Sequence, residues 1–131
     1  MFSQPDIVQI LSHARVFVCP SVYEPFEIVN LETMACDVPV VGSAVGGIPE
    51  IIVEGETGHL VRFDGDGTPK NEPRDPEAFA RDLARALNAL GTDPDRARRF
   101  GAAGRARVVE RFSWNAIAER TAALYRTLVK N

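Results

Sequence analysis

The chain has 131 residues, of which 45% are hydrophobic and 25% charged, and its net charge is −3. This length and composition suit one globular domain with a buried core. The small negative charge excludes a protein that binds nucleic acid or an acidic membrane through overall basicity, and no apolar run approaches the ~20 residues of a membrane-spanning helix.

The charges are unevenly distributed along the chain. Nine of the 15 basic residues, but only three of the 18 acidic ones, lie in residues 94–131. Such a basic segment could form a phosphate or nucleic-acid patch, or it could be the solvated face of two helices. No aromatic residues or binding motif accompany the arginines, which favours the solvated face and predicts no nucleic-acid partner.

The two cysteines, Cys19 and Cys36, lie in apolar segments without His or Cys neighbours at metal-ligand spacing. A disulfide framework needs more cysteines in so short a chain. We therefore expect reduced thiols, no metal site, and structural roles for His13 and His59. The first residues lack the features of a signal peptide, so a cytoplasmic location is expected.

The first half of the chain alternates short apolar runs with helical patterns. Continuous β-branched runs favour strands of a parallel sheet, and the first of them, Val16–Pro20, is expected to be buried on both faces. Strands that alternate with helices imply right-handed crossovers and a parallel sheet. In chain order the expected elements are a helix over Pro5–Ala14, the strand Val16–Pro20, a helix over 28–36, the strand Val38–Gly42, a short helix over Ile48–Val53 and the strand His59–Phe63.

The second half of the chain is predicted to be helical over about residues 75–129. Residues 64–75 are rich in Gly, Pro and charge, which indicates a surface loop. Asp75-Pro76 and Asp93-Pro94 are N-cap and N1 pairs that open two amphipathic helices. Gly101 and Gly104 weaken the middle of the second of these helices.

A last helix is expected after Ser113, its N-cap. Its apolar residues follow i, i+3, i+4, i+7 spacing from Trp114 to Leu128. This stripe is interpreted as a packing face rather than a cofactor site.

One dense group of candidate functional residues lies in Ser21–Glu32, between the first strand and the next helix. Ligands of open α/β sheets bind at the carboxyl ends of the strands, and a helix N-terminus there offers free N–H groups to a phosphate. Glu24 and Glu32 could each accept two hydrogen bonds from sugar hydroxyls, or be a loop charge and an exposed helix residue. The segment therefore suits a ligand with phosphate in the middle and hydroxyls at both ends, which is the shape of a nucleotide-sugar.

The segments PSVYEPF (20–26), IVNLE (28–32) and VGGIPEII (45–52) closely resemble the donor domain of GT-B glycosyltransferases, especially glycogen-synthase-like retaining enzymes of the group 1 glycosyl transferases. RFSW (111–114) and Tyr125 resemble the closing helices of that family. The resemblance covers essentially the whole chain. It implies a Rossmann-like α/β fold, in which residues 1–131 form a single partial domain, the second half of the donor-binding domain.

The resemblance also implies roles for residues of the E-x7-E motif. It places no catalytic residue and no metal ligand in this chain, and the expected ligand is a substrate rather than a cofactor. The family's roles fall on Glu24, Phe26 and Glu27 beside the donor sugar, on the backbone amides of Ile28 and Val29 at the diphosphate, and on Glu32 at the ribose.

Three positions depart from the family pattern. Position 27 usually carries glycine, and Glu27 adds bulk and a negative charge beside a dianion. A unit-charge pair 4 Å apart costs about 4 kcal/mol at an effective dielectric of about 20, so donor affinity falls unless Glu27 points outward. Thr33 and Asp37 replace Ala and Gly, and both are expected at the surface. Gly46-Gly47 matches a structural glycine turn.

The expected reaction is the transfer of a hexose, glucose from ADP-glucose or UDP-glucose, to a glycan or another hydroxyl acceptor. The configuration at the anomeric carbon is expected to be retained. The chain alone is expected to be inactive, because the acceptor domain and the phosphate-binding cations of the family lie outside the matched segment. The alternative is a non-catalytic truncated or engineered α/β module used for assembly or fusion. Glu27, at a position where the family usually carries glycine, favours this alternative. A dinucleotide-dependent oxidoreductase is disfavoured, since no G-x-G-x-x-G follows a strand.

The strand Val16–Pro20 would be central in the family's sheet and lacks a partner on one side here. An unpaired apolar edge is a template for another chain, which predicts a homo-oligomer. The alternative is a monomer in which Pro5–Ala14 or the last helix covers this edge.

Overall fold

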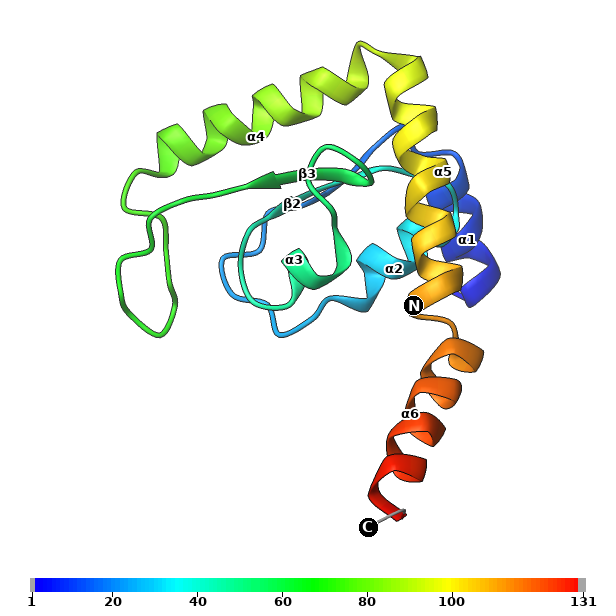
Figure 1. Cartoon of the computed structure of the whole chain (residues 1–131). Helices are drawn as coiled ribbons and strands as arrows, with labels where there is room; N and C mark the ends of the chain where they lie inside the picture. The colour runs from blue at the N-terminus through cyan, green and yellow to red at the C-terminus, as the bar shows by residue number, and fades with distance from the viewer. Residues whose placement is uncertain (1, 130–131) are drawn as a thin grey trace.

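The computed structural model describes residues 2–129. Within them, three parallel strands in the order β1-β2-β3 form one sheet (Figure 1). The strands are β1 (Phe17–Cys19), β2 (Val40–Ser43) and β3 (Gly58–Val61). The α/β architecture with a parallel sheet predicted from the sequence is confirmed.

The described part of the chain contains six helices: α1 (Gln4–Ser12), α2 (Ile28–Ala35), α3 (Ile48–Ile51), α4 (Pro76–Gly91), α5 (Pro94–Arg111) and α6 (Trp114–Val129). The predicted N-caps are confirmed by their hydrogen bonds. Asp75 accepts from the Ala78 amide at 2.8 Å, and Asp93 accepts from the Arg96 amide at 2.9 Å. The Ser113 hydroxyl accepts from the Ala116 amide at 3.2 Å.

The strands differ from the expected ranges in extent and burial. β2 begins at Val40 because the Val38 amide donates to the Thr33 carbonyl at 3.3 Å, which completes the turn after α2, and Pro39 has no N–H to donate. All four β2 residues are buried. Val18 of β1 is 38% exposed, so the expectation that this strand is buried on both faces is wrong.

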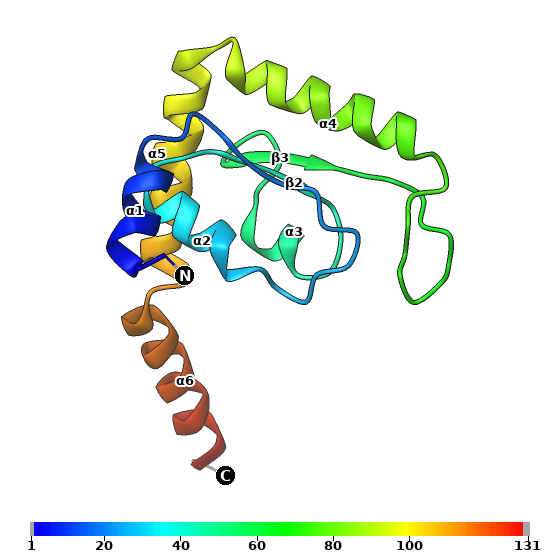
Figure 2. The same ribbon diagram turned by 180° about the vertical axis from the view of Figure 1, so that it is seen from behind.

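The core has two parts, one on each face of the sheet. α4 lies along one face, and α2 and α3 lie on the other (Figures 1 and 2). Close packing on both faces of β2 holds the carboxyl ends of the strands in fixed positions. The buried residues are Cys19, Met34, Val40, Ile48, Ile51 and Ile52 in the first cluster, and Val41, Val61, Phe79 and Leu90 in the second.

The two glycines of α5 are packing positions rather than weak points. The helix is unbroken through both. A Cβ at Gly101 would lie 1.9 Å from the Asp37 carbonyl oxygen, and one at Gly104 would lie 3.3 Å from the Met34 side chain. The glycines therefore allow α5 to approach the end of α2 closely, an arrangement that helix propensity alone does not indicate.

α6 extends away from the rest of the chain in both views (Figures 1 and 2). None of its residues is buried, and Trp114 is 86% exposed. The helix has the predicted amphipathic pattern, but the expected packing of its apolar stripe is not found among residues 2–129. Periodicity predicts a face that needs cover and does not identify what covers it.

Both cysteines are free, with Cys19 buried and Cys36 partly exposed. No helix in residues 2–129 combines the length and the apolar character needed to cross a membrane.

Candidate functional site

Residues 20–27 lead from the carboxyl end of β1 to the first turn of α2. Glu24 and Glu27 both lie on this loop. Glu32 lies further along α2, where the Gln4 side chain of α1 donates to it at 3.4 Å. The residues expected to form a site therefore gather along one loop and the helix that follows it.

Two side chains from other segments hold the loop in place. The buried Ser43 hydroxyl at the end of β2 lies 3.2 Å from the Cys19 carbonyl oxygen and donates to the Ser21 carbonyl. The Asn71 side-chain amide donates to the Val22 carbonyl at 2.9 Å. Sequence reasoning missed Asn71, since no spacing pattern relates a residue in the Gly- and Pro-rich loop to one that precedes it by 49 positions.

The Gly46-Gly47 turn packs directly against the same loop. The Gly47 amide donates to the Glu24 carbonyl at 3.2 Å. A Cβ at Gly46, whose φ is +51°, would lie 1.7 Å from that carbonyl oxygen, and one at Gly47 would lie 2.3 Å from the Pro25 carbonyl oxygen. The pair therefore shapes the candidate site as well as reversing the chain.

Phe26 contributes to the site through its backbone. Its side chain packs against the core on the α2 side of the sheet and lies 6.1 Å, centroid to centroid, from the Phe112 ring. Its amide donates to a Glu24 carboxylate oxygen at 3.4 Å. Its main chain is thus the part that contacts Glu24, and its expected role beside a ligand stays a prediction.

Glu27 adopts a backbone conformation that favours glycine. Its φ is 69° and its ψ 81°, in the left-handed region, which the Cβ of an L-residue disfavours. This gives a second reason for the glycine that the family pattern usually has here, besides close approach to a diphosphate. Asp37 also has a positive φ, 61°, and is exposed as expected. Thr33 is fully buried, so its expected surface position is wrong.

Glu24 is the main influence on the pKa of Glu27. A hydrogen bond with Glu24 raises the pKa of Glu27 above its ordinary value, and burial and the charge of Glu24 act in the same direction. A carboxyl near a like charge holds its proton more tightly. The described residues contain no group of three or more His, Cys, Asp or Glu side chains that could hold a metal ion.

The first turn of α2 presents unused backbone donors. Glu27 is the N-cap and makes no side-chain cap. The Asn30 amide donates to the Glu27 carbonyl at 3.1 Å, whereas those of Ile28 and Val29 have no acceptor among residues 2–129. Ile28 is 66% exposed. Free amides and the positive end of the helix dipole make this turn suitable for an anion.

Two arginines of the basic segment bind helix ends instead of facing solvent alone. Arg105 donates to the Ala35 carbonyl at 2.5 Å. Arg107 donates to the Ile51 and Glu50 carbonyls at 2.8 and 2.7 Å. Their positive charge at the C-terminal ends of α2 and α3 is stabilising, so the expectation of a solvated face is incomplete.

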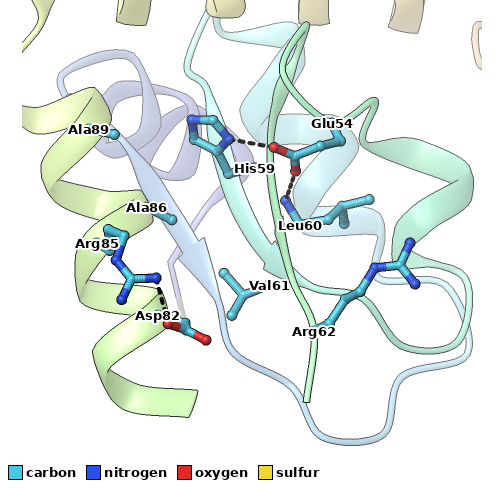
Figure 3. Close-up of a pocket in the computed structure, with 9 residues that line it drawn as sticks. All are labelled: Glu54, His59, Leu60, Val61, Arg62, Asp82, Arg85, Ala86 and Ala89. Carbon is cyan, nitrogen blue, oxygen red and sulfur yellow. Dashed lines mark hydrogen bonds and ion pairs between the residues drawn. The ribbon is translucent and has the colours of Figure 1, made fainter. Parts of the chain in front are cut away.

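A separate cavity of about 420 Å³ lies between the outer edge of β3 and α4. The Glu54 carboxylate in it binds Nδ1 of His59 at 2.8 Å and accepts from the Leu60 amide (Figure 3). Asp82 pairs with Arg85 on α4 at 2.8 Å. These charges are paired within the chain, and Glu54 occupies a backbone donor of the edge strand, which protects that edge from pairing with another strand. His59 thus contacts Glu54 within the chain, and its structural role stays a prediction.

Comparison with known sequences identifies a family. The family described as "Glycosyl transferases group 1" matches residues 2–89. The α-maltose-1-phosphate synthase of Mycolicibacterium smegmatis is 56% identical over 126 residues, which are 96% of this chain and 30% of that protein. The glycogen synthase of Mycobacterium tuberculosis is 34% identical over 92% of this chain and 26% of that protein. The chain therefore spans less than a third of the length of these relatives.

Solved structures agree with the sequence matches. The sucrose-phosphate synthase of Thermosynechococcus elongatus superimposes with a TM-score of 0.78 at 39% identity, over 99% of this chain and 29% of that one. Anabaena Alr3699/HepE, in complex with UDP and glucose, superimposes with a TM-score of 0.73 over 93% of this chain and 30% of that one. Its identity is 24%, so this likeness concerns the fold.

Proposed function

The chain belongs to the group 1 glycosyl transferases, and we propose that it forms the donor-binding part of a cytoplasmic, retaining hexosyltransferase. The donor is a nucleotide-sugar, ADP-glucose or UDP-glucose, and the acceptor is a hydroxyl of a glycan or another small molecule. Residues 1–131 form the second half of the donor-binding domain.

The free amides of Ile28 and Val29 are the observation that carries this proposal. They lie at the carboxyl end of a parallel sheet, where α/β proteins bind ligands. Glu24 lies four residues before Ile28, on the loop that leads into α2. Glu32 follows Ile28 by four residues, about 6 Å along the helix axis. A diphosphate bound at the amides is thus flanked by one carboxylate on each side, the sugar lying toward Glu24 and Phe26 and the ribose toward Glu32.

The names of the relatives support transfer of a hexose. Synthesis of α-maltose-1-phosphate, glycogen or sucrose-phosphate adds a sugar to a saccharide or a sugar phosphate. UDP and glucose in the HepE complex support a nucleotide-sugar donor for a protein of this fold. In such a reaction the chain's contribution is electrostatic, since backbone dipoles stabilise the departing diphosphate.

Isothermal titration of the chain with ADP-glucose, UDP-glucose, ADP and UDP tests donor binding. We expect the diphosphate compounds to bind and glucose alone not to bind, with weaker binding for a variant in which proline replaces Val29 and removes one amide. An Asn115→Pro variant, at the second residue of α6 as Val29 is of α2, controls for the introduction of proline. Absence of binding by every nucleotide tested would refute the proposal.

Group transfer needs a second experiment. This chain replaces the matching segment of the M. smegmatis α-maltose-1-phosphate synthase, a match of 126 residues, and formation of the product is measured. The chimera is expected to keep the activity with the same nucleotide-sugar, and its inactivity in a folded state would argue for a non-catalytic module.

We also propose that the chain forms homo-oligomers. No strand in residues 2–129 pairs with the outer edge of β1, and the apolar stripe of α6 is exposed. Pairing of two β1 edges, or exchange of α6 between two chains, would cover these surfaces.

A further inference from the structure

The 64–75 loop, which connects β3 to α4, reaches across to the loop that precedes α2 (Figure 1). The side-chain amide of Asn71 donates to the Val22 carbonyl at 2.9 Å. Among residues 2–129 this carbonyl accepts no other hydrogen bond. Val22 lies two residues before Glu24, which the proposed function places beside the donor sugar. The contact therefore joins a surface loop to the segment that carries Glu24.

The 64–75 loop has a defined conformation of its own. The Arg74 side chain donates to the carbonyls of Gly65 and Asp66 at 2.9 and 3.2 Å. The Asp66 carboxylate accepts from the Thr68 amide at 2.9 Å. None of these hydrogen bonds uses the side chain of Asn71, so the loop should stay folded when that side chain is replaced.

Two residue types allow Asn71 to reach Val22. The φ of Asn71 is 52°, in the left-handed region, which asparagine enters more readily than most residues. A Cβ at Gly65 would lie 1.9 Å from the Asn71 side-chain oxygen, so glycine leaves the space that the amide group occupies. The backbone of Asn71 and the missing side chain of Gly65 thus both serve the same contact.

The other supports of the loop before α2 come from the buried part of the fold. The Ser43 hydroxyl, at the end of β2, donates to the carbonyl that precedes Val22 in the chain. The Gly47 amide, in the turn before α3, donates to the Glu24 carbonyl at 3.2 Å. Asn71 adds a third donor between these two, from a loop outside the core. The orientation of Glu24 therefore depends on a residue that is distant in sequence and close to solvent.

We propose that Asn71 is a positioning residue for recognition of the donor sugar, because its hydrogen bond to Val22 holds Glu24 in the orientation that receives the sugar. The inference rests on the proposed function. In that proposal the diphosphate and the ribose bind to α2, and no hydrogen bond among the described residues joins that helix to the 64–75 loop. Loss of the Asn71 amide should therefore weaken binding of the sugar and spare binding of the nucleotide.

The size of the effect follows from the bond that is lost. A hydrogen bond between neutral groups changes an equilibrium constant by about two- to tenfold. Without it, a smaller fraction of the chains holds Glu24 in the oriented state, and the apparent affinity for a ligand that needs this state falls with that fraction. A ligand without a sugar beside Glu24 does not depend on the state.

The test is isothermal titration of the full chain with ADP-glucose and UDP-glucose, each compared with ADP or UDP. Asn71→Gly removes the amide and keeps a residue suited to the left-handed region. Asn71→Asp keeps the shape of the side chain and replaces the donor by an acceptor oxygen. Asn88→Asp, at an exposed asparagine of α4, introduces the same charge elsewhere and is the matched control. Hydrogen exchange of the Gly47 amide, which the Glu24 carbonyl accepts, reports on the loop directly.

We expect both Asn71 variants to lose about two- to tenfold more affinity for the nucleotide-sugar than for the matching nucleotide. Their Gly47 amide should exchange faster by a similar factor, and Asn88→Asp should change neither property. Equal losses for nucleotide-sugar and nucleotide, or no loss for either, would overturn the positioning role while donor binding stands. If the wild type binds no nucleotide-sugar, the proposed function fails and this inference fails with it.

Discussion

Replacement of Glu27 by glycine should stabilise the chain. An L-residue in the left-handed region costs about 1–2 kcal/mol, and the φ of 69° places Glu27 there. The greater freedom of glycine in the unfolded chain offsets about 0.4–1 kcal/mol of this. The net gain is about 0.5–1 kcal/mol, which raises the melting temperature of a domain of this size by about 2–4 °C.

The gain should grow with pH. Contact with Glu24 raises the pKa of Glu27 in the folded chain, so the folded state holds the proton more tightly than the unfolded state. As the pH rises above the unfolded pKa the wild type loses stability, and the loss is complete once the pH exceeds the folded pKa. Removal of Glu27 abolishes this loss, and the advantage of glycine is therefore larger at pH 7.5 than at pH 4.

Urea denaturation followed by circular dichroism at both pH values measures the difference. Gly55→Ala is the matched control, because Gly55 has a φ of +73° and nothing lies within 4 Å of an added Cβ. It should cost about 1 kcal/mol at either pH. Glu27→Ala keeps the backbone cost and should show only the pH-dependent gain. A Glu27→Gly variant no more stable than the wild type at pH 7.5, beside a destabilised Gly55→Ala, would refute the reasoning.

Four further outcomes are expected. In an enzyme that carries this domain, Glu24→Ala and Glu32→Ala should each weaken donor use by about 1–3 kcal/mol, and unchanged kcat/KM for the donor would contradict their roles. Gly46→Ala should destabilise the chain by about 2–4 kcal/mol, since the new Cβ meets the Glu24 carbonyl; urea denaturation measures this, and a loss below that of Gly55→Ala would argue against the contact. The chain alone should transfer no radiolabelled glucose to maltooligosaccharide. Radioactivity in the product above that of a protein-free blank would overturn this prediction. Light scattering at micromolar concentration should show association, whereas a 14.3 kDa species at every concentration would mean that the β1 edge is covered.

Local signals in the sequence predicted most of the fold. Asp75 and Asp93 each precede a proline, and both form the expected N-cap hydrogen bonds. β-branched runs placed the three strands, because a parallel sheet needs apolar residues on both faces. The placement of the site between β1 and α2 followed from the same alternation, since it determines which strand ends precede helices.

Features that depend on distant contacts were not predictable in this way. The bond from Asn71 to the loop after β1 and the contacts of Arg107 with α3 join residues 49 and 56 positions apart. The stripe of α6 was recognised, but its partner is not among the residues of the chain that the structure describes. Glu27 shows the limit most clearly, because helix and strand patterns carry no information on the sign of φ at a single loop residue.

Two opposing effects act on the Glu27 carboxyl at the start of α2. A carboxylate at a helix N-terminus is stabilised by about 0.3–1 kcal/mol, which would lower its pKa. The hydrogen bond with Glu24, burial and the charge of Glu24 act in the opposite direction and raise the pKa. A diphosphate drawn to the free amides of Ile28 and Val29 meets the same dipole and the negative charge of Glu24 and Glu27. Its binding is favoured by the amides and opposed by that charge, and replacement of Glu27 by glycine, which removes one of the two charges, should therefore strengthen it.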